Sequence, residues 1–409
     1  MSKRVVVTGI GAISPVGNDI KTFWDNLTAG VNGIDKISRF DTEPFKSKLA
    51  AEVKGFDPLE HFEKLFANKT DLYTLYALTS ADEAVKDSGI IGNIDPDELS
   101  VYFGSGTGGI LTLCEENIKC ETQGPRRVSP QFVPKMCINI ASGQIAIKYG
   151  AHGSALCVST ACATATTAIG ESFRAIRDGY TTAVICGGTE AAITPVCIAG
   201  FQNLQALSQS EDKDAASLPF DSRRAGFILG EGSGALILEE YEHALARGAH
   251  IYCEMVGYGA TCDAHHITAP DPEATYTAKA VTKALSGVEY DASRLYINAH
   301  GTGTHFNDIA ETTAFKKAFG DDAYKLKISS TKSMTGHMLG AAGAIEAIAC
   351  IKAIETGIVP PTINLTSPDP ELDLNYTPLK AVKADVDVAI STSLGFGGHN
   401  ACVAFKKLR

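Results

Sequence analysis

Residues 156–179 read LCVSTACATATTAIGESFRAIRDG, and this stretch decides the fold. A short apolar run ends in VSTAC, and a helix of small residues follows it directly. The same order of strand, polar turn and helix returns in the second half, as NAHGTGT (298–304) before DIAETTAFKKAF (308–319) and KISSTKSMTGH (327–337) before MLGAAGAIEAIACIKAI (338–354). We therefore expect two similar halves, residues 1–248 and 249–409, that join near Gly248.

Short runs rich in β-branched residues recur along the whole chain and indicate strands that are buried on both faces. Helical stretches, such as 70–88 and 171–179, lie between them. This alternation predicts an α/β layered fold. The expected strands are 4–8, 101–104, 183–186, 235–238, 295–298, 327–329 and 388–391.

The composition argues against several classes of protein. The chain has 409 residues, is 44% hydrophobic and carries a net charge of −11, which argues against a nucleic-acid partner. No apolar run reaches the ~18 residues of a membrane helix, so no membrane partner is expected. The 11 cysteines form no CxxC pair and lie among apolar residues, which favours reduced thiols in the cytoplasm over zinc sites or secretion.

Cys162 is the sharpest candidate for chemistry, because it stands where the strand end at 158–162 meets the helix. Backbone N–H groups in the first turn of a helix are unpaired and carry partial positive charge. That environment lowers the pKa of a thiol, so we expect a thiolate-like nucleophile. The alternative is a buried structural cysteine, which is what we expect of nearly all the others.

Two histidines follow buried strands in the second half. His300 ends a strand before a glycine-rich turn, and His337 lies where a strand and turn become a helix. Lys332 and Glu346 flank His337 in the sequence, and an ion pair between them would orient its imidazole. Glu346 lies within an almost wholly apolar helix, which disfavours simple exposure. A structural histidine, a surface lysine and an exposed glutamate are the alternatives.

Two further features carry a weaker signal. GFGG (395–398) follows the strand AISTS, and a backbone N–H there could join that of Cys162 in an oxyanion hole, although a plain turn has the same composition. Asp263, His265 and His266 lack the spacing of a metal site, so we expect a loop without metal. Spacing alone gives His305 and His399 no role.

Several of these segments occur together in an order that is typical of one family. VSTACATAT, NAHGTGT, STKSMTGHMLGAAGAIEA, PPTINLTSPDP and GFGGHN closely resemble the motifs of the elongating 3-oxoacyl-[acyl carrier protein] synthases of type II. The resemblance runs from VVVTGIGAISPVG to the last strand. It implies the thiolase fold, a duplicated five-layer α-β-α-β-α sandwich. It also implies a homodimer that acts on chains held by acyl carrier protein.

The resemblance also implies roles for individual residues. Cys162 matches the acylated nucleophile, and His300 and His337 match the pair that activates the malonyl thioester. Phe396 matches the gating phenylalanine, and its N–H matches the second oxyanion donor. The further positions are Lys332, Glu346 and Glu311 in support, Thr302 and Thr304 on the phosphopantetheine arm, Thr268 and Pro270 at the malonyl pocket, and Gly397 in the glycine-rich turn at the substrate.

The chemistry implied is a Claisen-type decarboxylative condensation in fatty-acid elongation, which gives a 3-oxoacyl carrier thioester and CO₂. Cys162 holds the acyl chain, two N–H groups hold the oxyanion, and two histidines stabilise the enolate. No metal or redox cofactor is implied, because phosphopantetheine carries the substrates. His337 stands where type III and chalcone-type synthases have Asn, and the GFGGHN turn lacks the second cysteine of degradative thiolases.

The chain departs from the family pattern at several positions. The usual HGTSTP is HGTGTH here, with Gly303 and His305 in place of Ser and Pro. Thr392 and Leu394 replace the Asn and Phe of SNSFGFGG. Thr107 stands where a bulkier aliphatic residue often limits the acyl pocket, so we expect a more open pocket floor.

The surface expected to bind the carrier protein also differs from the family pattern. FANKTD replaces the basic ARKMD segment, and Gln205 and Gln209 replace arginines. These changes predict weaker or different docking of an acidic carrier. The remaining basic candidates for carrier contact are Lys64, Lys69, Arg126 and Arg127.

Two other functions stay open at this point. The altered docking surface is compatible with the ketosynthase of a specialised polyketide or aryl-polyene pathway. A non-catalytic partner subunit of a heterodimer is the third interpretation, and the presence of Cys162, His300, His337 and Lys332 disfavours it.

Overall fold

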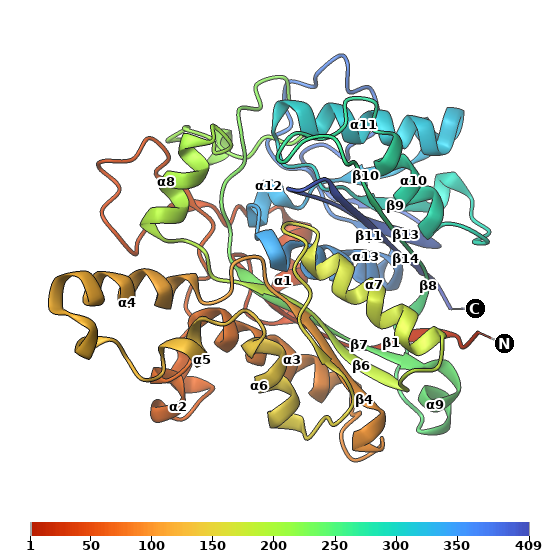
Figure 1. Ribbon diagram of the computed structural model, residues 1–409. Coiled ribbons are helices and arrows are strands. Elements are labelled where there is room, and N and C mark those ends of the chain that lie inside the picture. Colours follow the sequence, from red (N-terminus) through yellow and green to blue (C-terminus); the bar gives the residue numbers. More distant parts are fainter. Residues whose placement is uncertain (1, 409) are drawn as a thin grey trace.

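The computed structural model describes residues 2–408, and one large mixed sheet organises them (Figure 1). Its strand order is β10-β9-β13-β14-β8-β1-β7-β6-β4-β5, so the strands of each half stay together. β1 and β8 join the halves through antiparallel pairing of 5–7 with 253–255. The strands are β1 (Val5–Ile13), β4 (Leu99–Gly104), β5 (Ala155–Leu156), β6 (Ala183–Glu190), β7 (Gly232–Glu240), β8 (Cys253–Cys262), β9 (Leu295–Asn298), β10 (Lys327–Ser329), β13 (Val388–Gly395) and β14 (His399–Lys406).

The two half-sheets repeat one another in topology. From the seam outward, β1-β7-β6-β4-β5 has two antiparallel pairings followed by two parallel ones. The order β8-β14-β13-β9-β10 has the same sequence of pairings. β4 therefore corresponds to β9, β5 to β10 and β6 to β13, which is the duplication that the sequence predicts.

Helices form three layers around the half-sheets (Figure 1). α7 and α13 contact each other between the half-sheets, α7 against β4 and β6 and α13 against β9 and β13. α3 and α6 cover the outer face of the first half-sheet, while α10, with α11 packed on it, covers that of the second. The helices are α1 (Ile20–Ala29), α2 (Lys64–Asn68), α3 (Leu72–Ser88), α4 (Ile110–Gln123), α5 (Phe132–Met136), α6 (Ile140–Tyr149), α7 (Thr164–Arg177), α8 (Pro195–Asn203), α9 (Tyr241–Ala246), α10 (Thr275–Ala284), α11 (His305–Phe319), α12 (Lys332–Thr335) and α13 (Ala342–Thr356).

The central helices approach closely because small residues form their contact. A Cβ on Gly343 of α13 would lie 2.0 Å from the hydroxyl oxygen of Thr166 on α7, so only glycine fits there. Thr166 also shares a hydrogen bond of 2.7 Å with Ser393, which ties α7 to β13. The crossing brings the N-terminal ends of both helices, and the turns that precede them, to the same place.

The expected strands are all present, and most are buried along their whole length, as a sheet covered on both faces requires. Three strands of the large sheet were not identified by the sequence analysis, namely β5, whose two residues are both exposed, β8, whose apolar pattern is interrupted by glycines, and β14. Two small two-stranded sheets, β2 (Asp35–Lys36) with β3 (Leu49–Ala50) and β11 (Ile358–Val359) with β12 (Val382–Lys383), lie outside the large one. Within residues 2–408, no helix is both long and apolar enough to cross a membrane.

Candidate active site

A cavity of about 530 Å³ opens between the two halves, where strands of both end. Cys162 follows β5, His300 follows β9 and His337 follows β10, and all three line this cavity. Their exposed fractions are 9%, 3% and 2%, so the reactive groups lie at its buried end. Other residues that the sequence analysis named also line it, namely Phe396, Thr302, Thr304, Thr268, Pro270 and His305.

The turn that carries Cys162 is sharp. Ala161 has a φ of 50°, a left-handed conformation that is uncommon for alanine, and it aims the next side chain into the cavity. A Cβ on Gly395 would lie 2.6 Å from the carbonyl oxygen of Thr160, so glycine permits the GFGG turn to pack against this one. As a result, the backbone N–H groups of Phe396 and Cys162 both face the Cys162 sulfur, where they favour its charged form.

The expected low pKa of Cys162 is wrong. Burial raises the pKa of this thiol to about 12, and the positive charge of Lys332 and the N–H of Phe396 offset that only in part. Moreover, α7 begins at Thr164. Cys162 therefore lies just before the helix and not in its first turn, where the sequence analysis expected it. The loss of hydration outweighs the local N–H groups, so the thiol is protonated at neutral pH.

Backbone hydrogen bonds fix both histidines. His300 donates its N–H to Glu311 Oε1 at 2.7 Å, and His337 donates its N–H to the carbonyl of Ile228 at 2.7 Å. The two rings lie edge to face with centroids 5.2 Å apart, and Phe227 packs against the His337 ring at 5.1 Å. Ile228 and Phe227 belong to the first half, so His337 is held by both halves.

Both imidazoles are neutral at physiological pH. Burial lowers the pKa of His300 and of His337 well below the usual value, and the nearby charge of Lys332 adds to that effect. The Nδ1 atoms of both rings are buried without a hydrogen-bond partner. A neutral imidazole carries one N–H, so each ring can donate one hydrogen bond to a bound molecule.

The ion pair expected near His337 is present. Lys332 Nζ bonds Glu346 Oε1, and the side chains are 2% and 3% exposed. Burial raises the pKa of Glu346, while the charge of Lys332 opposes the rise. The second carboxylate oxygen of Glu346 has no hydrogen-bond partner. The pair therefore places the Lys332 ammonium group beside the two histidines, with its charge balanced by the Glu346 carboxylate.

Two buried carboxylates hold the loops around the cavity. Glu311 accepts the N–H groups of His300 and Gly301, both at 2.7 Å, and burial raises its pKa to about 7. Glu190, which the sequence analysis missed, accepts the N–H groups of Gly106 and Thr107 at 2.9 and 3.1 Å. The available signal was a charged residue at the end of a strand that carries no other charge, which is similar to Glu346 in its apolar helix.

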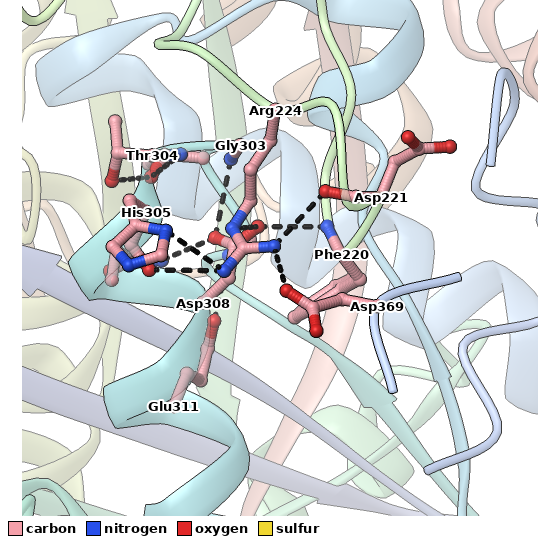
Figure 2. Close-up of polar contacts among 12 residues, drawn as sticks. Phe220, Asp221, Arg224, Gly303, Thr304, His305, Asp308, Glu311 and Asp369 are labelled. Carbon is pink, nitrogen blue, oxygen red and sulfur yellow. Dashed lines mark hydrogen bonds and ion pairs between the residues drawn. The ribbon is translucent and has the colours of Figure 1, made fainter. Parts of the chain in front are cut away.

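A buried arginine forms a second cluster that sequence reasoning missed (Figure 2). Arg224 lines the cavity wall, its side chain is 1% exposed, and it pairs with Asp369 at 2.7 Å. Asp308 lies 3.9 Å from its Nε and accepts the N–H groups of Phe220 and Gly303 at 2.8 and 3.2 Å. The cluster thereby connects the loop before 227 with the start of α11.

Not every residue named from the sequence lines this cavity. Thr107 lies outside its wall and donates its hydroxyl to Glu190 at 2.6 Å, and Gly397 lies outside it in the turn, with its N–H on the carbonyl of Ile267. The candidate carrier contacts are on the surface instead. Lys69 lines a shallow pocket with Gln131, a residue that soon follows the basic pair at 126–127. All four candidates are exposed, namely Lys64, Lys69, Arg126 and Arg127.

The histidine-rich loop is held by hydrogen bonds. Asp263 accepts the side-chain N–H of Asn400 at 2.6 Å, and His266 Nδ1 accepts the N–H of Ala269 at 3.1 Å. No group of three or more His, Cys, Asp or Glu side chains within residues 2–408 is arranged to hold a metal ion. The hydrogen bonds place Thr268 and Pro270 on the cavity wall.

Comparison with known proteins defines the class. Residues 2–244 match the family "Beta-ketoacyl synthase, N-terminal domain" and residues 252–366 match "Beta-ketoacyl synthase, C-terminal domain". Similar solved structures include the ketosynthase in a complex with acyl-carrier protein of a type II polyketide synthase and the ishigamide ketosynthase/chain length factor. They share 34% and 35% identity, a TM-score of 0.92 each, and full coverage of both chains. The fold is thus the thiolase-like fold of ketosynthases, as the sequence predicts.

Sequence relatives narrow the class further. The chain is 50% identical to 3-oxoacyl-[acyl-carrier-protein] synthase 2 of Synechocystis sp. (strain ATCC 27184 / PCC 6803 / Kazusa), over 99% of this chain and 98% of that protein. It is 49% identical to the protein of the same name from Staphylococcus aureus (strain N315), over 99% of each. The chain belongs to the beta-ketoacyl synthase family, whose members are condensing enzymes of the acyltransferase type. The resemblance recognised from the sequence motifs is confirmed.

Proposed function

We propose that the chain is a 3-oxoacyl-[acyl carrier protein] synthase that elongates fatty-acyl chains, with Cys162 as the nucleophile. The observation that carries this proposal is the convergence of one thiol, two neutral imidazoles and two backbone N–H donors at the buried end of one cavity. The identity of about half the residues with two synthases of that name supports the same activity.

The first step is transfer of an acyl group from a carrier thioester to Cys162. The sulfur attacks the thioester carbonyl, and the N–H groups of Cys162 and Phe396 stabilise the oxyanion. The carbon–sulfur bond to the carrier then breaks. Because the Cys162 thiol starts protonated, its proton must leave during the attack, and the departing carrier thiolate takes it up.

The second step uses the two histidines. A malonyl thioester enters, its carboxylate carbon–carbon bond breaks, and CO₂ leaves with the electron pair remaining on the thioester as an enolate. The N–H groups of His300 and His337 donate to the enolate oxygen and stabilise its charge. Their low pKa values keep both rings neutral, so neither donates its proton fully to the enolate.

The third step forms the new carbon–carbon bond. The enolate carbon attacks the carbonyl of the acyl group on Cys162, and the same two backbone N–H groups hold the second oxyanion. The bond from carbon to Cys162 sulfur breaks, the 3-oxoacyl carrier thioester departs, and the thiolate takes a proton from water. Atoms and charge balance without a redox cofactor or a metal, in keeping with what the resemblance implies.

Carrier binding and subunit pairing belong to the same proposal. Lys64, Lys69, Arg126 and Arg127 offer positive charge for an acidic carrier on a chain that is acidic overall. The edge of the large sheet in the first half is β5, where Leu156 is 47% exposed. Ile147 of the neighbouring α6 is 76% exposed. Such an edge with apolar neighbours favours pairing with a second copy, so we expect a homodimer. The reduced cysteines that the sequence predicts favour the cytoplasm as its location.

Intact-mass analysis tests the function directly. The protein is mixed with acyl-carrier thioesters of graded length and then with malonyl-carrier. We expect an acyl adduct that is absent in Cys162→Ala and that malonyl-carrier discharges as a 3-oxoacyl product. No adduct from any carrier or coenzyme A thioester, with folded protein, would contradict the proposal.

The polyketide interpretation is the second candidate, because the similar solved structures include polyketide ketosynthases. Sequence identity to those proteins is lower than to the fatty-acid synthases, which favours elongation. Acyl length separates the two functions in the same experiment. Adducts with saturated chains of many lengths support fatty-acid use, whereas adducts with polyketide chains alone support the other function.

A further inference from the structure

His305 occupies an unusual position at the cavity. It is the first residue of α11, follows Thr304 directly and lies on the cavity wall with an exposed side chain. Phe306, which is 69% exposed, lies beside it with its ring 5.4 Å away, edge to face. High exposure places both at the mouth, whereas Cys162 and the catalytic histidines are buried. The family motif HGTSTP has proline at this position, so this chain adds a polar group to the entrance.

Arg224 determines which ring nitrogen of His305 can donate a hydrogen bond to a ligand. Its guanidinium nitrogen lies 3.4 Å from His305 Nδ1, and the same nitrogen bonds the His305 carbonyl at 3.4 Å (Figure 2). A guanidinium group has donors only, so Nδ1 must accept. With Nδ1 as the acceptor, Nε2 is the ring nitrogen that faces a ligand as a donor.

The arginine cannot easily release the ring. Its other terminal nitrogen donates to Asp369 at 2.7 Å and to the carbonyl of Asp221 at 3.0 Å. Its Nε faces Asp308 at 3.9 Å, and the whole side chain is 1% exposed. These contacts, from two loops and α11, fix the guanidinium fork (Figure 2). The charged groups that face the His305 ring are thus Arg224 and, behind it, Asp369 and Asp308.

We propose that His305 is a specificity residue for the carrier arm, whose Nε2–H donates a hydrogen bond to an oxygen of the pantetheine or its phosphate at the cavity mouth. Arg224 is its positioning residue, since it holds Nδ1 as an acceptor and leaves Nε2–H for the ligand. This inference rests on the proposed function and deepens it. An arm that passes Thr302 and Thr304 also passes His305, because all three line the same wall.

Three thioesters of one acyl group test the assignment. Coenzyme A carries the arm and phosphate, pantetheine carries the arm alone, and N-acetylcysteamine lacks most of it. The rate of Cys162 acylation is measured by intact mass for the parent and for His305→Ala. We expect the variant to raise KM about fivefold or more for the coenzyme A thioester with little change in maximal rate, and to leave the N-acetylcysteamine reaction unchanged.

The pantetheine thioester identifies the accepting oxygen. Loss with pantetheine as well as coenzyme A assigns the bond to an amide of the arm, and loss with coenzyme A alone assigns it to the phosphate. Equal loss with all three thioesters, or no loss with any, overturns the inference. If the parent is acylated by none of these three thioesters and by no acyl-carrier thioester, the proposed function itself fails, which is a distinct result.

Further variants separate recognition from structure. His305→Gln retains an N–H near the Nε2 position and should restore at least half of the lost affinity. His305→Pro removes the donor without strain, because Thr304 has φ −93° and ψ 146° and the first helical position suits proline. It should behave as His305→Ala does. His250→Ala, a matched change at an exposed histidine that does not line the cavity, should leave all three reactions unchanged. Failure of glutamine to restore binding counts against a donated hydrogen bond.

Discussion

The two halves of the molecule place different chemistry at two corresponding pairs of strand ends. The loop after β4 carries no reactive side chain, whereas the corresponding loop after β9 carries His300. The turn after β5 carries Cys162, and the corresponding segment after β10 carries Lys332 and His337. One half therefore supplies the thiol that we propose as the nucleophile, and the other supplies the groups that we expect to stabilise the enolate.

Both halves nevertheless support the first of these loops in the same way. A buried carboxylate accepts two consecutive backbone N–H groups, those of Gly106 and Thr107 at Glu190 and those of His300 and Gly301 at Glu311. The carboxylates come from different elements, the end of β6 and the middle of α11. Both halves thus hold the loop backbone with a buried carboxylate. The side chains on the two loops can therefore differ.

The largest effect should come from the reactive groups themselves. Cys162→Ala should abolish the acyl adduct, whereas His300→Ala and His337→Ala should still take up an acyl group but lose about 10²–10⁴ of the condensation rate. The measurement is intact mass for the adduct and product formation from malonyl-carrier. If the histidine variants also lose acylation, the division of labour between the halves is wrong.

The buried ion pair of the second half should show the next largest effect. Lys332→Met leaves Glu346 unpaired in the core and should lower the free energy of unfolding by about 3–5 kcal/mol. Lys21→Met breaks an exposed pair with Asp25 and should leave the free energy of unfolding almost unchanged. Urea denaturation measures both. The double variant Lys332→Met/Glu346→Leu should recover much of the loss, and failure to recover would point to a role in packing instead.

The loop carboxylate of the second half should make stability depend on pH. The folded pKa of Glu311, about 7, lies above its unfolded value near ~4.3, so the folded state binds the proton more tightly. The stabilising contribution is complete below the unfolded pKa and is lost as pH rises through about 7. Glu311→Gln should flatten this decline between pH 5 and pH 8 by about 1–3 kcal/mol, as measured by urea midpoints.

Glu83 provides a control for that profile. Burial also raises its pKa to about 7, so it contributes a similar decline in the parent and in Glu311→Gln. The difference between the two profiles therefore isolates Glu311. Parallel profiles would mean that the carboxylate titrates near its ordinary value despite its burial.

The smallest effect concerns the loop of the first half. Thr107 donates its hydroxyl to Glu190 and lies outside the cavity that Cys162 lines. This position limits its contact with an acyl chain on Cys162. If the residue nevertheless opens the pocket floor, Thr107→Ile should shift the preferred acyl length downward and change relative rates about tenfold. Competition between acyl-carrier thioesters measures the shift. An unchanged length preference would remove Thr107 from the floor.

Sequence patterns predict the strands well because a strand buried on both faces needs a continuous apolar run. They predict the positions of His300 and His337 because each follows such a run, and that of Cys162 because it stands between a short apolar segment and a helix of small residues. The pKa of Cys162 could not be predicted, since it depends on how deeply the tertiary structure buries the sulfur. Arg224 and its carboxylates were missed because Asp308 and Asp369 lie far away in the sequence and meet it only in the fold.

The division of the site between two halves that meet at β1 and β8 has a consequence for the order in which the site is synthesised. His300 follows Cys162 by on the order of 140 residues, so at ~5–20 residues per second its synthesis comes on the order of ten seconds later. During that interval the first half has its thiol but lacks α13, the helix that covers α7 on the side of the second half. A nascent chain at this stage presents an apolar surface and a cysteine with no histidine partner. We therefore expect the enzyme to become reactive only when its second half closes over the first.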